Sequence, residues 1–424
     1  MCLAVPLKLI EIHGNDAVGE AMGMRRAVRV DFIPEPKLGD YVMGTRVLPS
    51  SAWRRRRLRR IWRPGRSFAM RSDERCRGIL EAMARLPLPE TRIMEVCGTH
   101  TMAIAESGIR SLLPAQVQLL SGPGCPVCVT PPEDIDAVLD LAGEKDLILT
   151  GYGDMLRVPG SRRGDSLLRR RALGADVRIV YSPMDALAIA EQEPGKQVVF
   201  LGIGFETTAP GTAAAALSAK ARGLRNFTVL SLLKTVEPAL RALMAMDDFA
   251  VNGFLCPGHV ATIIGEEGFR FLPEEYGMPA VIGGFEPDEI LLAVYLLLKQ
   301  IAESRPRVQN AYPRAVRPEG NRMAQKVLHE AFRPAAARWR GLGEIPDSGL
   351  ALREELADLD AGIRFGIVPG TAKLQSGCRC GDVICGKLRP KDCPLFGKLC
   401  TPEDPVGPCM VSSEGACAAA YKYE

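Results

Sequence analysis

The chain has 424 residues, of which 47% are hydrophobic and 25% are charged, and its formal net charge is +4. This composition is ordinary for a globular protein and excludes a disordered or collagen-like chain, and the length suggests two or three domains. No apolar run reaches the roughly 18 residues that a membrane-spanning helix needs, and the N-terminus lacks the basic and apolar regions of a signal peptide. We therefore expect a cytoplasmic protein that does not act in a membrane.

Residues 1–45 contain short alternating apolar runs that Gly and Pro separate, a pattern typical of a small β-barrel. The next stretch, residues 46–69, has a foreign composition: between Arg46 and Arg66 it holds nine Arg and no acid. The positive net charge therefore comes from one block, whereas a nucleic-acid-binding protein carries basic charge over its folded surface. We expect a solvated basic linker or a docking arm for an acidic partner, and no nucleic-acid binding.

Residues 70–305 alternate between strand-like and helix-like patterns, which predicts parallel sheets covered by helices on both faces. The strand-like runs are Ile93–Val96, Val117–Leu120, Leu147–Leu149, Val177–Tyr181, Val198–Ile203, Thr228–Leu232 and Val251–Leu255. The helical patterns are Thr101–Leu113, Pro183–Glu191, Thr207–Arg222 and Pro287–Glu303. Seven or more strands suggest two such α/β units, whose ligands bind beyond the carboxyl ends of the strands.

Residues 306–424 begin with two helical patterns, Asn321–Phe332 and Leu350–Leu359, and end in a tail rich in Cys, Gly and Pro. Seven of the 13 Cys lie between Cys378 and Cys417. In a reducing compartment such a density indicates metal or redox chemistry rather than a disulfide scaffold. A tail without apolar periodicity cannot build a core, so we expect a metal to hold it together.

The first chemical motif is CGTH, from Cys97 to His100, which follows the strand Ile93–Val96 directly. A thiol at a strand-to-helix turn lies near a helix N-terminus, which favours the thiolate. His100 is close enough in sequence to hydrogen-bond to the sulfur. The alternative is that Cys97 is a small buried residue of the core.

The next strand ends in GPGCPVC, which contains Cys125 and Cys128. The C-x2-C spacing suits a reversible disulfide or half of a metal site. The sequence has no second C-x2-C, so a four-cysteine zinc ribbon is not expected.

Two further candidates follow later strands. Glu206 lies in GIGFETTAPGTAAAAL, whose Gly202, Gly204 and Gly211 allow close approach of a phosphate, although the Lys of a Walker motif is absent. His259 lies in CPGHV after the strand Val251–Leu255. A lone histidine is often structural, but His259, like Cys97 and Glu206, lies beyond a strand end, which favours a functional role.

The tail carries the third group of thiols. Four of them have the spacing C-x14-C-x6-C-x16-C, and three more lie between them: Cys378, Cys393, Cys400 and Cys417, with Cys380, Cys385 and Cys409. Four thiolates suit an iron–sulfur cluster or zinc. The spacings differ from those of radical enzymes and bacterial ferredoxins, so residue chemistry alone leaves open which four are ligands.

Taken together, CGTH, GPGCPVC, GYGDMLRVPGS, GFETTAP, CPGHV and PLFGKLCTPEDPVGPCMVSSEGAC resemble the motifs of the hydrogenase maturation family HypD, over about residues 70–424. The opening MCLAVPLK and the later GDYV resemble the small partner family HypC, so the chain resembles a HypC–HypD fusion. The resemblance implies two similar α/β domains around a cleft, residues 70–175 and 176–305. It also implies an iron–sulfur domain of residues 306–424, after a partial HypC-like barrel of residues 1–45 and an Arg-rich linker of residues 46–69.

The resemblance further implies a scaffold and redox protein that assembles the Fe(CN)2CO group of nickel–iron hydrogenases. The residues matching family sites are Cys97 and the HypC-type Cys2 for transient iron with CN and CO, Cys125 and Cys128 for a redox pair, and Cys378, Cys393, Cys400 and Cys417 for a [4Fe-4S] cluster. Soft thiolates suit low-spin iron of this kind. The implied partners are a HypC-type chaperone, a HypE-type cyanide donor and the precursor of the hydrogenase large subunit.

One departure from the family pattern stands out. HypC proteins continue after GDYV with a His-containing strand and an acidic helix, whereas this chain continues with GTRVLPSSAWRRRRLRRIW. The codons for Gly44–Leu48 can be chosen so that a frame beginning at the third base reads His-Ala-Gly-Phe, and a shifted run of AGG codons reads Glu. We therefore hypothesise that a frameshift truncates the HypC-like segment. The segment then lacks the His that binds iron in HypC proteins, because His13 does not lie at the matching position.

Two functions remain from different classes. The first is a maturation scaffold that holds iron on Cys97 and hands on the finished group for insertion into the hydrogenase. The second is a cluster-dependent disulfide reductase that uses Cys125 and Cys128. Only the first needs Cys97 as an iron ligand outside the cluster.

Overall fold

The computed structural model describes residues 4–14, 16–21, 24–30, 35–39, 41–45, 74–162, 164–367 and 377–424. Cys2 and the Arg-rich block from Arg46 to Arg66 lie outside these residues. Among the described residues, no helix combines the length and the hydropathy that crossing a bilayer requires.

The N-terminal segment forms a four-stranded antiparallel sheet, in the order β3-β2-β1-β4. Its strands are β1 (Ala4–His13), β2 (Asp16–Ala21), β3 (Met24–Arg29) and β4 (Tyr41–Thr45). Leu9, Ala17 and Val30 form a small buried cluster in this segment. A small antiparallel sheet is thus present where the partial barrel was predicted, and among the described residues β3 and β4 are its two edges and do not pair with each other.

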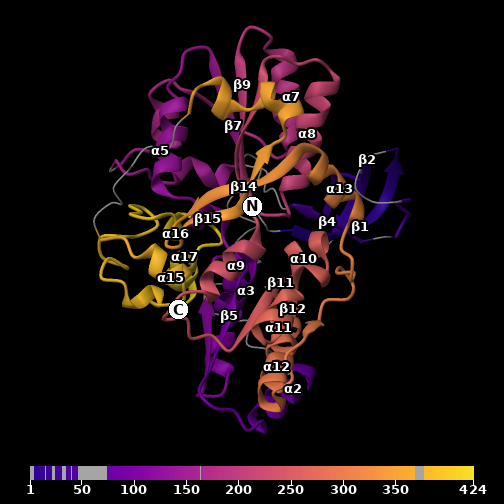
Figure 1. The fold of residues 1–424 in the computed structure, drawn as a ribbon, viewed down its shortest axis with the longest axis vertical. Helices are drawn as coiled ribbons and strands as arrows, with labels where there is room; N and C mark the ends of the chain where they lie inside the picture. The colour runs from indigo at the N-terminus through magenta and orange to yellow at the C-terminus, as the bar shows by residue number, and fades with distance from the viewer. Residues whose placement is uncertain are drawn as a thin grey trace.

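A parallel five-stranded sheet forms the lower lobe in Figure 1, in the order β13-β12-β11-β5-β6. Its strands are β5 (Thr91–Glu95), β6 (Val117–Ser121), β11 (Gly253–Pro257), β12 (Ala280–Gly283) and β13 (Val308–Asn310). Apolar side chains on one face pack against α2 (Glu74–Ala84), α3 (Gly98–Ser107) and α12 (Pro287–Glu303). On the other side of the sheet lie α10 (Gly258–Ile264) and α11 (Phe271–Tyr276).

Helix α12 illustrates why these segments are helical. Its first turn is acidic, and the side chains of Glu286 and Glu289 form a reciprocal cap with the backbone N–H groups of that turn. Its apolar residues recur at helical spacing, so that Ile290, Val294 and Leu297 are fully buried. Burial of each such side chain contributes about 1.5–3 kcal/mol.

A second parallel sheet of four strands forms the upper lobe, in the order β10-β9-β7-β8. Its strands are β7 (Leu147–Gly151), β8 (Asp176–Ile179), β9 (Gln197–Gly204) and β10 (Phe227–Leu233). Helices α7 (Pro183–Gln192) and α8 (Ala209–Ala221) cover one face, and α5 (Pro132–Leu141) and α6 (Leu167–Ala172) cover the other. The predicted parallel α/β architecture is confirmed.

The two sheets do not come from consecutive halves of the chain. After β6 the chain leaves the five-stranded sheet, builds the whole four-stranded sheet, and returns at β11. The expected boundary between residues 175 and 176 therefore falls inside one sheet, between β7 and β8, which pair with each other. Strand-like runs show which segments are extended, but not which of them pair.

One predicted helix ends earlier than expected, and another is not an α-helix. Gly108 has φ 68° and ends α3, and the 3-10 turn η1 (Ile109–Leu112) follows; a left-handed glycine is a common helix terminator. The helix predicted over Leu350–Leu359 is wrong, because its first residues belong to a strand, β15 (Gly343–Leu352), and the 3-10 turn η4 (Glu354–Leu359) follows.

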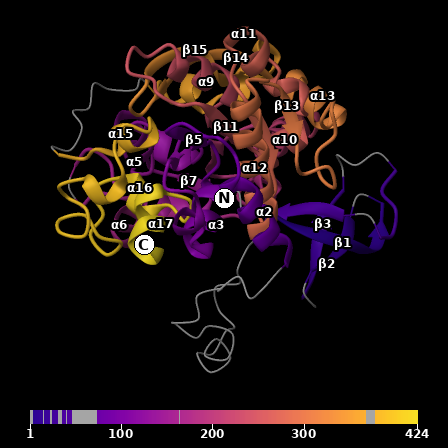
Figure 2. The same cartoon turned by 90° about the horizontal axis from the view of Figure 1, so that it is seen from below.

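The remaining chain connects and covers the lobes. It contains α4 (Pro126–Val129), η2 (Gly153–Arg157), α9 (Val236–Met244), η3 (Glu267–Phe269), α13 (Arg322–Ala331), β14 (Phe332–Trp339), α14 (Ala361–Arg364), α15 (Cys380–Ile384), η5 (Pro390–Asp392), α16 (Pro408–Val411) and α17 (Ala416–Tyr423). Strands β14 and β15 form an antiparallel hairpin. Figures 1 and 2 both show the Cys-rich tail (yellow) on the side of the molecule away from the N-terminal sheet (indigo).

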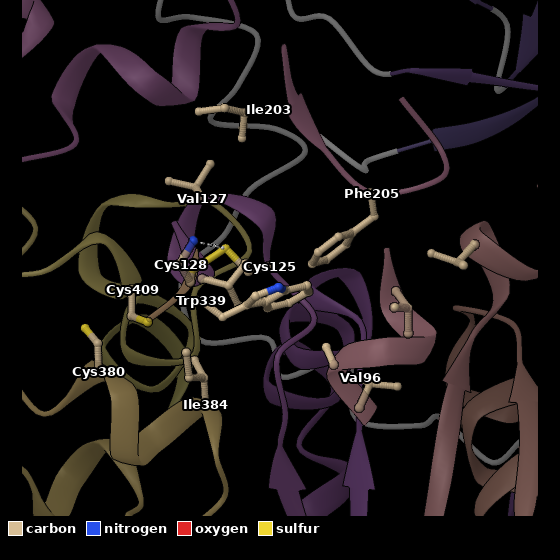
Figure 3. Packing of buried hydrophobic residues seen from close by; sticks show 14 of the residues in the cluster. Val96, Cys125, Val127, Cys128, Ile203, Phe205, Trp339, Cys380, Ile384 and Cys409 are labelled. Atoms are coloured by element: carbon tan, nitrogen blue, oxygen red, sulfur yellow. Dashed lines mark hydrogen bonds between the residues drawn. A yellow bond between two sulfur atoms is a disulfide. The ribbon is translucent and has the colours of Figure 1, made fainter. Parts of the chain in front are cut away.

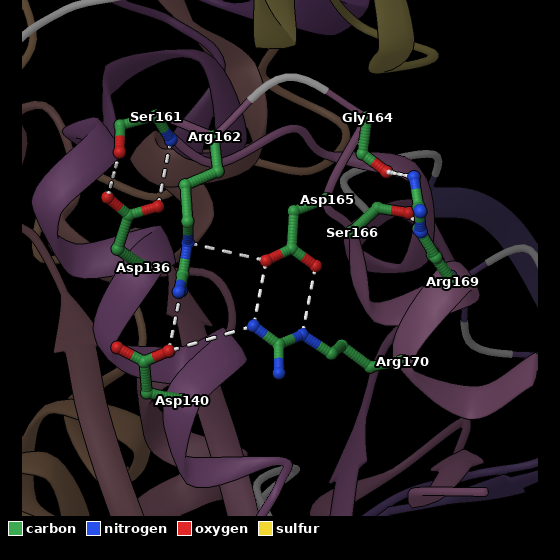
Figure 4. Close-up of polar contacts among 9 residues, drawn as sticks. All are labelled: Asp136, Asp140, Ser161, Arg162, Gly164, Asp165, Ser166, Arg169 and Arg170. Carbon is green, nitrogen blue, oxygen red and sulfur yellow. Dashed lines mark hydrogen bonds and ion pairs between the residues drawn. The ribbon is translucent and has the colours of Figure 1, made fainter. Parts of the chain in front are cut away.

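A polar network holds the motif GYGDMLRVPGS against α5 (Figure 4). Ser161 N donates to Asp136 Oδ1 at 2.8 Å, and a Cβ on Gly160 would lie 2.2 Å from the same oxygen. Arg170 donates two hydrogen bonds to the Asp165 carboxylate, at 2.8 and 2.9 Å. The network fixes the loop that follows η2 to helix α5.

Candidate functional site

Cys97 lies at the end of β5 and is the N-cap residue of α3, with a backbone in the extended region. Gly98 N donates to Gly124 O at 3.0 Å, which joins the CGTH turn to the GPGCPVC turn. A Cβ on Gly124 would lie 2.2 Å from Cys97 N, so only glycine fits at this contact. The two turns expected to carry chemistry therefore touch, backbone against backbone.

Buried polar groups fix the backbone around Cys97. Cys97 N donates to Glu95 Oε2 at 3.1 Å, and Thr101 Oγ1 donates to Glu95 Oε1 at 2.5 Å. Burial raises the pKa of Glu95 to about 7, although these hydrogen bonds oppose the shift. The Glu95 side chain thus links the last residue of β5 to the first turn of α3.

The two candidate histidines meet at Phe285. The His259 ring stacks on Phe285 with 3.9 Å between centroids, and the His100 ring lies 4.7 Å from it. Because β11 pairs in parallel with both β5 and β12, the residues that follow these strands come together at one edge of the sheet. Cys97, His100 and His259 therefore belong to one end of the five-stranded sheet.

His100 does not hydrogen-bond to the sulfur, as the sequence had suggested. Its Nε2 is 2.8 Å from Gly284 O, and its Nδ1 has no hydrogen-bond partner among the described residues. Burial lowers the pKa of His100 to about 4, so the ring is neutral at pH 7 and Nε2 carries the proton. The hydrogen bond to Gly284 O, just beyond β12, therefore replaces the expected hydrogen bond from His100 to the Cys97 sulfur.

Cys125 and Cys128 are joined by a disulfide across the first turn of α4. Cys125 is the N-cap of this short helix, and Cys128 N donates to Cys125 Sγ at 3.2 Å. Both residues are buried, and Ser412 Oγ of the tail lies 3.3 Å from Cys125 Sγ. Of the two chemistries that the C-x2-C spacing allowed, the geometry corresponds to the disulfide.

The hairpin β14–β15 covers this pair, which the sequence analysis did not foresee. Trp339 stacks on Phe205 with 5.9 Å between centroids, and the next residue, Arg340, donates its backbone N–H to Val129 O at 2.8 Å. Figure 3 shows Trp339 and Phe205 on one side of the pair and Cys409 and Cys380 of the tail on the other. The disulfide therefore lies between the upper lobe and the Cys-rich tail.

The tail brings the four expected cluster ligands to one small cavity. Cys378, Cys393, Cys400 and Cys417 line it, together with Cys380. A Cβ on Gly407 would lie 2.5 Å from Cys378 Sγ, so the backbone is kept close to the thiols there. The cavity has a volume of about 20 Å³, so a bound cluster would displace side chains that now meet in it.

A donor set of four thiols fits an iron–sulfur cluster in its chemistry. Within the described residues, no three metal-ligating side chains converge on a single ion position. A four-iron cluster does not require such convergence, because each thiolate binds a different iron. Cys385, which lies outside the lining, has a pKa raised to about 11 by burial, and its Sγ is 3.6 Å from Gly341 O.

The fifth thiol, Cys380, is a neighbour that sequence spacing could not exclude. Its Sγ is 3.2 Å from Cys378 Sγ, and the hydrogen bond that the two share lowers the pKa of Cys378 and raises that of Cys380. Cys380 also contacts Cys409, which is fully buried. Figure 3 shows Cys409 nearer than Cys380 to the Cys125–Cys128 pair.

Glu206 follows β9 in the upper lobe and is almost fully buried. Its Oε1 accepts a hydrogen bond from Val236 N, the first residue of α9, at 2.8 Å, and its Oε2 has no partner in the described part of the chain. Burial raises its pKa to about 7. Glu206 thus holds the start of a helix, and its neighbour Phe205 contacts the hairpin over the disulfide.

Glu414 is a buried tail residue that sequence reasoning missed. A Cβ on Gly98 would lie 2.5 Å from Glu414 Cβ, and Thr99 Oγ1 donates to Glu414 Oε1 at 3.4 Å. Glu414 N donates to Ser412 Oγ, the atom beside Cys125. The tail segment from Ser412 to Glu414 therefore touches both chemical turns, and no periodicity or spacing in the sequence marks it.

Comparison with known protein families gives two matches. Residues 74–424 match the HypD model, described as "Hydrogenase formation hypA family", and residues 1–45 match the HupF/HypC family. The second match ends immediately before the Arg-rich block begins.

Curated relatives match over most of the chain. The hydrogenase expression/formation protein HupD of Azotobacter chroococcum is 46% identical over 343 residues, covering 80% of this chain and 90% of the relative. The hydrogenase maturation factor HypD of Rhizobium leguminosarum is 46% identical over 344 residues, covering 80% and 89%. The HypD of Escherichia coli K12 is 44% identical over 333 residues, covering 78% and 89%.

Proposed function

Because this chain belongs to the HypD family of hydrogenase maturation factors over residues 74–424, with a HupF/HypC-family segment at residues 1–45, we propose that it is the scaffold on which an Fe(CN)2CO group is assembled. In this proposal Cys97 holds the iron, which is cargo, and the finished group passes on to the precursor of the hydrogenase large subunit.

One observation carries the proposal: the Cys97 turn and the Cys125–Cys128 turn are bonded to each other. The hydrogen bond from Gly98 N to Gly124 O and the close contact at Gly124 allow little relative movement between them. An iron ion bound by Cys97 would therefore lie next to a two-electron redox couple. A cysteine with only a structural role at position 97 would not require a redox-active disulfide beside it.

The surroundings of Cys97 suit an iron that carries small π-acceptor ligands. The thiolate supplies a soft donor, and the N-terminus of α3 stabilises its negative charge. The Phe285 ring, with His100 and His259 against it, forms an aromatic wall at the same edge of the sheet. We assign His259 as the group that hydrogen-bonds to a cyanide nitrogen.

The Cys125–Cys128 pair serves as the redox couple of the proposal. Reduction of the disulfide takes up two electrons and two protons and yields two thiols, and the reverse reaction returns them. A [4Fe-4S] cluster, which Cys378, Cys393, Cys400 and Cys417 would hold, supplies single electrons when it is bound. Packing of α15 and α16 against α4 places the redox pair directly against this tail.

The proposed partners follow from the cargo. A HypE-type protein would donate cyanide, and a HypC-type chaperone would carry iron to or from Cys97, either as residues 1–45 of this chain or as a separate protein. We propose that these exchanges take place in the cytoplasm. A disulfide reductase remains the second candidate, because the Cys125–Cys128 disulfide lies against the tail thiols.

Infrared spectroscopy and iron analysis separate the two candidates. The chain is purified without oxygen from cells that produce a cyanide donor. A scaffold shows CN and CO stretching bands and one iron beyond those of the cluster. A protein with cluster iron only, no such bands, and full activity as a disulfide reductase would overturn the proposal.

A further inference from the structure

A second pocket lies away from Cys97, between the five-stranded sheet and the tail. It has a volume of about 290 Å³, near the lower end of the range for ligand pockets. All five residues of β6 line it from one side, and residues of α15, η5 and α17 line it from the other. No step of the proposed function uses this pocket.

Strand β6 is an edge of its sheet, since β5 is its one partner among the residues that the structure describes. The hydrogen bonds from Thr91 N to Gln116 O and from Gly122 N to Glu95 O show which residues of this segment face β5. Alternate residues point the other way, so the N–H and C=O groups of Leu119 and Ser121 face outward. Nothing in the described part of the chain hydrogen-bonds to these outward groups.

The pocket is also cationic. Arg110, Arg389 and Lys391 contribute to its lining, against the single acid Glu424. Arg110 Nη1 lies 2.7 Å from Glu424 Oε1, and Lys391 Nζ donates to the Glu424 carbonyl oxygen at 2.7 Å. Arg110 thus already pairs with a side-chain carboxylate of this chain in the pocket, and Lys391 contacts the backbone of the same residue, so the lining places two cations where an acidic residue lies.

We propose that this pocket binds an extended acidic segment of a partner polypeptide, which adds to β6 as a sixth strand and places a carboxylate between Arg110 and Lys391. Backbone groups of Leu119 and Ser121 bond to the segment, as in other cases of strand addition. The partner's carboxylate takes the place of Glu424. This inference is independent of iron binding at Cys97.

A blocked peptide, Val-Glu-Val-Glu-Val, labelled with fluorescein, tests the proposal by fluorescence anisotropy on the full chain. The Arg110→Ala/Lys391→Ala variant should bind it roughly tenfold more weakly or worse, because it loses the charged pairs. Glu424→Gln should bind it more tightly, because it removes the internal competitor. Lys220→Ala/Arg222→Ala, at the exposed end of α8 where these cations pair with Asp358 and Glu191, removes the same two charges and should bind as the wild type does.

A second probe tests strand addition without altering the protein. Replacing the central Val of the peptide by Pro removes a backbone donor and should abolish binding to the wild-type chain. Equal binding of the two peptides, or unchanged binding by the Arg110→Ala/Lys391→Ala variant, would overturn the proposal. Dimerisation of the wild-type chain that this variant abolishes would assign the pocket to a second copy and would also overturn it.

Discussion

Replacing Glu206 by Gln should make the protein less sensitive to pH between weakly acidic and weakly basic conditions. In the unfolded chain Glu206 titrates near its ordinary pKa of 4.5, whereas burial raises its pKa to about 7 in the folded chain. Between these values the folded state binds more protons than the unfolded state, so stability falls as pH rises. The pKa difference corresponds to about 3 kcal/mol of unfolding free energy that the wild type loses by pH 8.

The Gln side chain retains an oxygen that can accept the hydrogen bond from Val236 N and carries no charge at any pH. Relative to the wild type, the unfolding free energy of Glu206→Gln should therefore rise by about 3 kcal/mol from pH 4 to pH 8. Urea unfolding at a series of pH values, followed by circular dichroism, measures this difference. Glu95, whose pKa is also raised, is present in both proteins and cancels in the comparison.

An opposite control is available on the surface. Hydrogen bonding to Arg241 lowers the pKa of Glu275, so Glu275→Gln should lose stability relative to the wild type as pH rises through the acidic range. A difference between Glu206→Gln and the wild type that stays constant from pH 4 to pH 8 would refute a buried, titrating carboxyl at this position.

Three further predictions follow from the same structure. After anaerobic reconstitution, Cys393→Ala should lack the broad cluster absorbance and the sulfide of the wild type. Cys385→Ala, whose thiol lies outside the thiol-lined cavity, should keep both. Unchanged iron and sulfide in Cys393→Ala would exclude Cys393 as a ligand. Gly124→Ala should lower the free energy of unfolding, measured in urea, by about 3 kcal/mol or more, because the new Cβ meets the Cys97 backbone. Gly78→Ala in α2 places its Cβ in open space and should be neutral or stabilising. Equal effects of the two substitutions would contradict the contact between the two turns. Resequencing of the codons for Arg46–Arg66 and intact-mass measurement of the native protein should reveal a frameshift, whose correction restores a His and an acidic helix. A native protein whose mass includes the Arg run would refute the frameshift. If the Arg run is translated, trypsin should cut it readily.

The parallel α/β architecture was predictable because its strands are short apolar runs, and Val198–Ile203 within β9 is an example. Strand order was not predictable, because pairing joins β5 to β11 across the whole four-stranded sheet. The β14–β15 hairpin was also missed: its strands mix polar and apolar residues, and a helical pattern was assigned to Leu350–Leu359 instead.

The candidate site shows the same division. Sequence motifs located the Cys97 turn, the Cys125–Cys128 pair and the tail thiols because strand ends and Cys spacing are local features. They could not show that Glu414 reaches the CGTH turn, since that contact joins residues more than 300 positions apart. His100 was assigned to the wrong partner for the same reason, because Gly284 O comes from a distant strand end.

The central claim is that Cys97 binds the iron on which CN and CO are assembled. The most direct measurement is infrared spectroscopy, with iron analysis, of anaerobically purified Cys97→Ala beside Cys256→Ala. Cys256 is a matched control, because it is a buried thiol on the adjacent strand β11 and burial alone raises its pKa. The proposal predicts that Cys97→Ala keeps the cluster iron but loses the extra iron and both sets of bands, while Cys256→Ala keeps them all. Unchanged CN and CO bands in Cys97→Ala would contradict it.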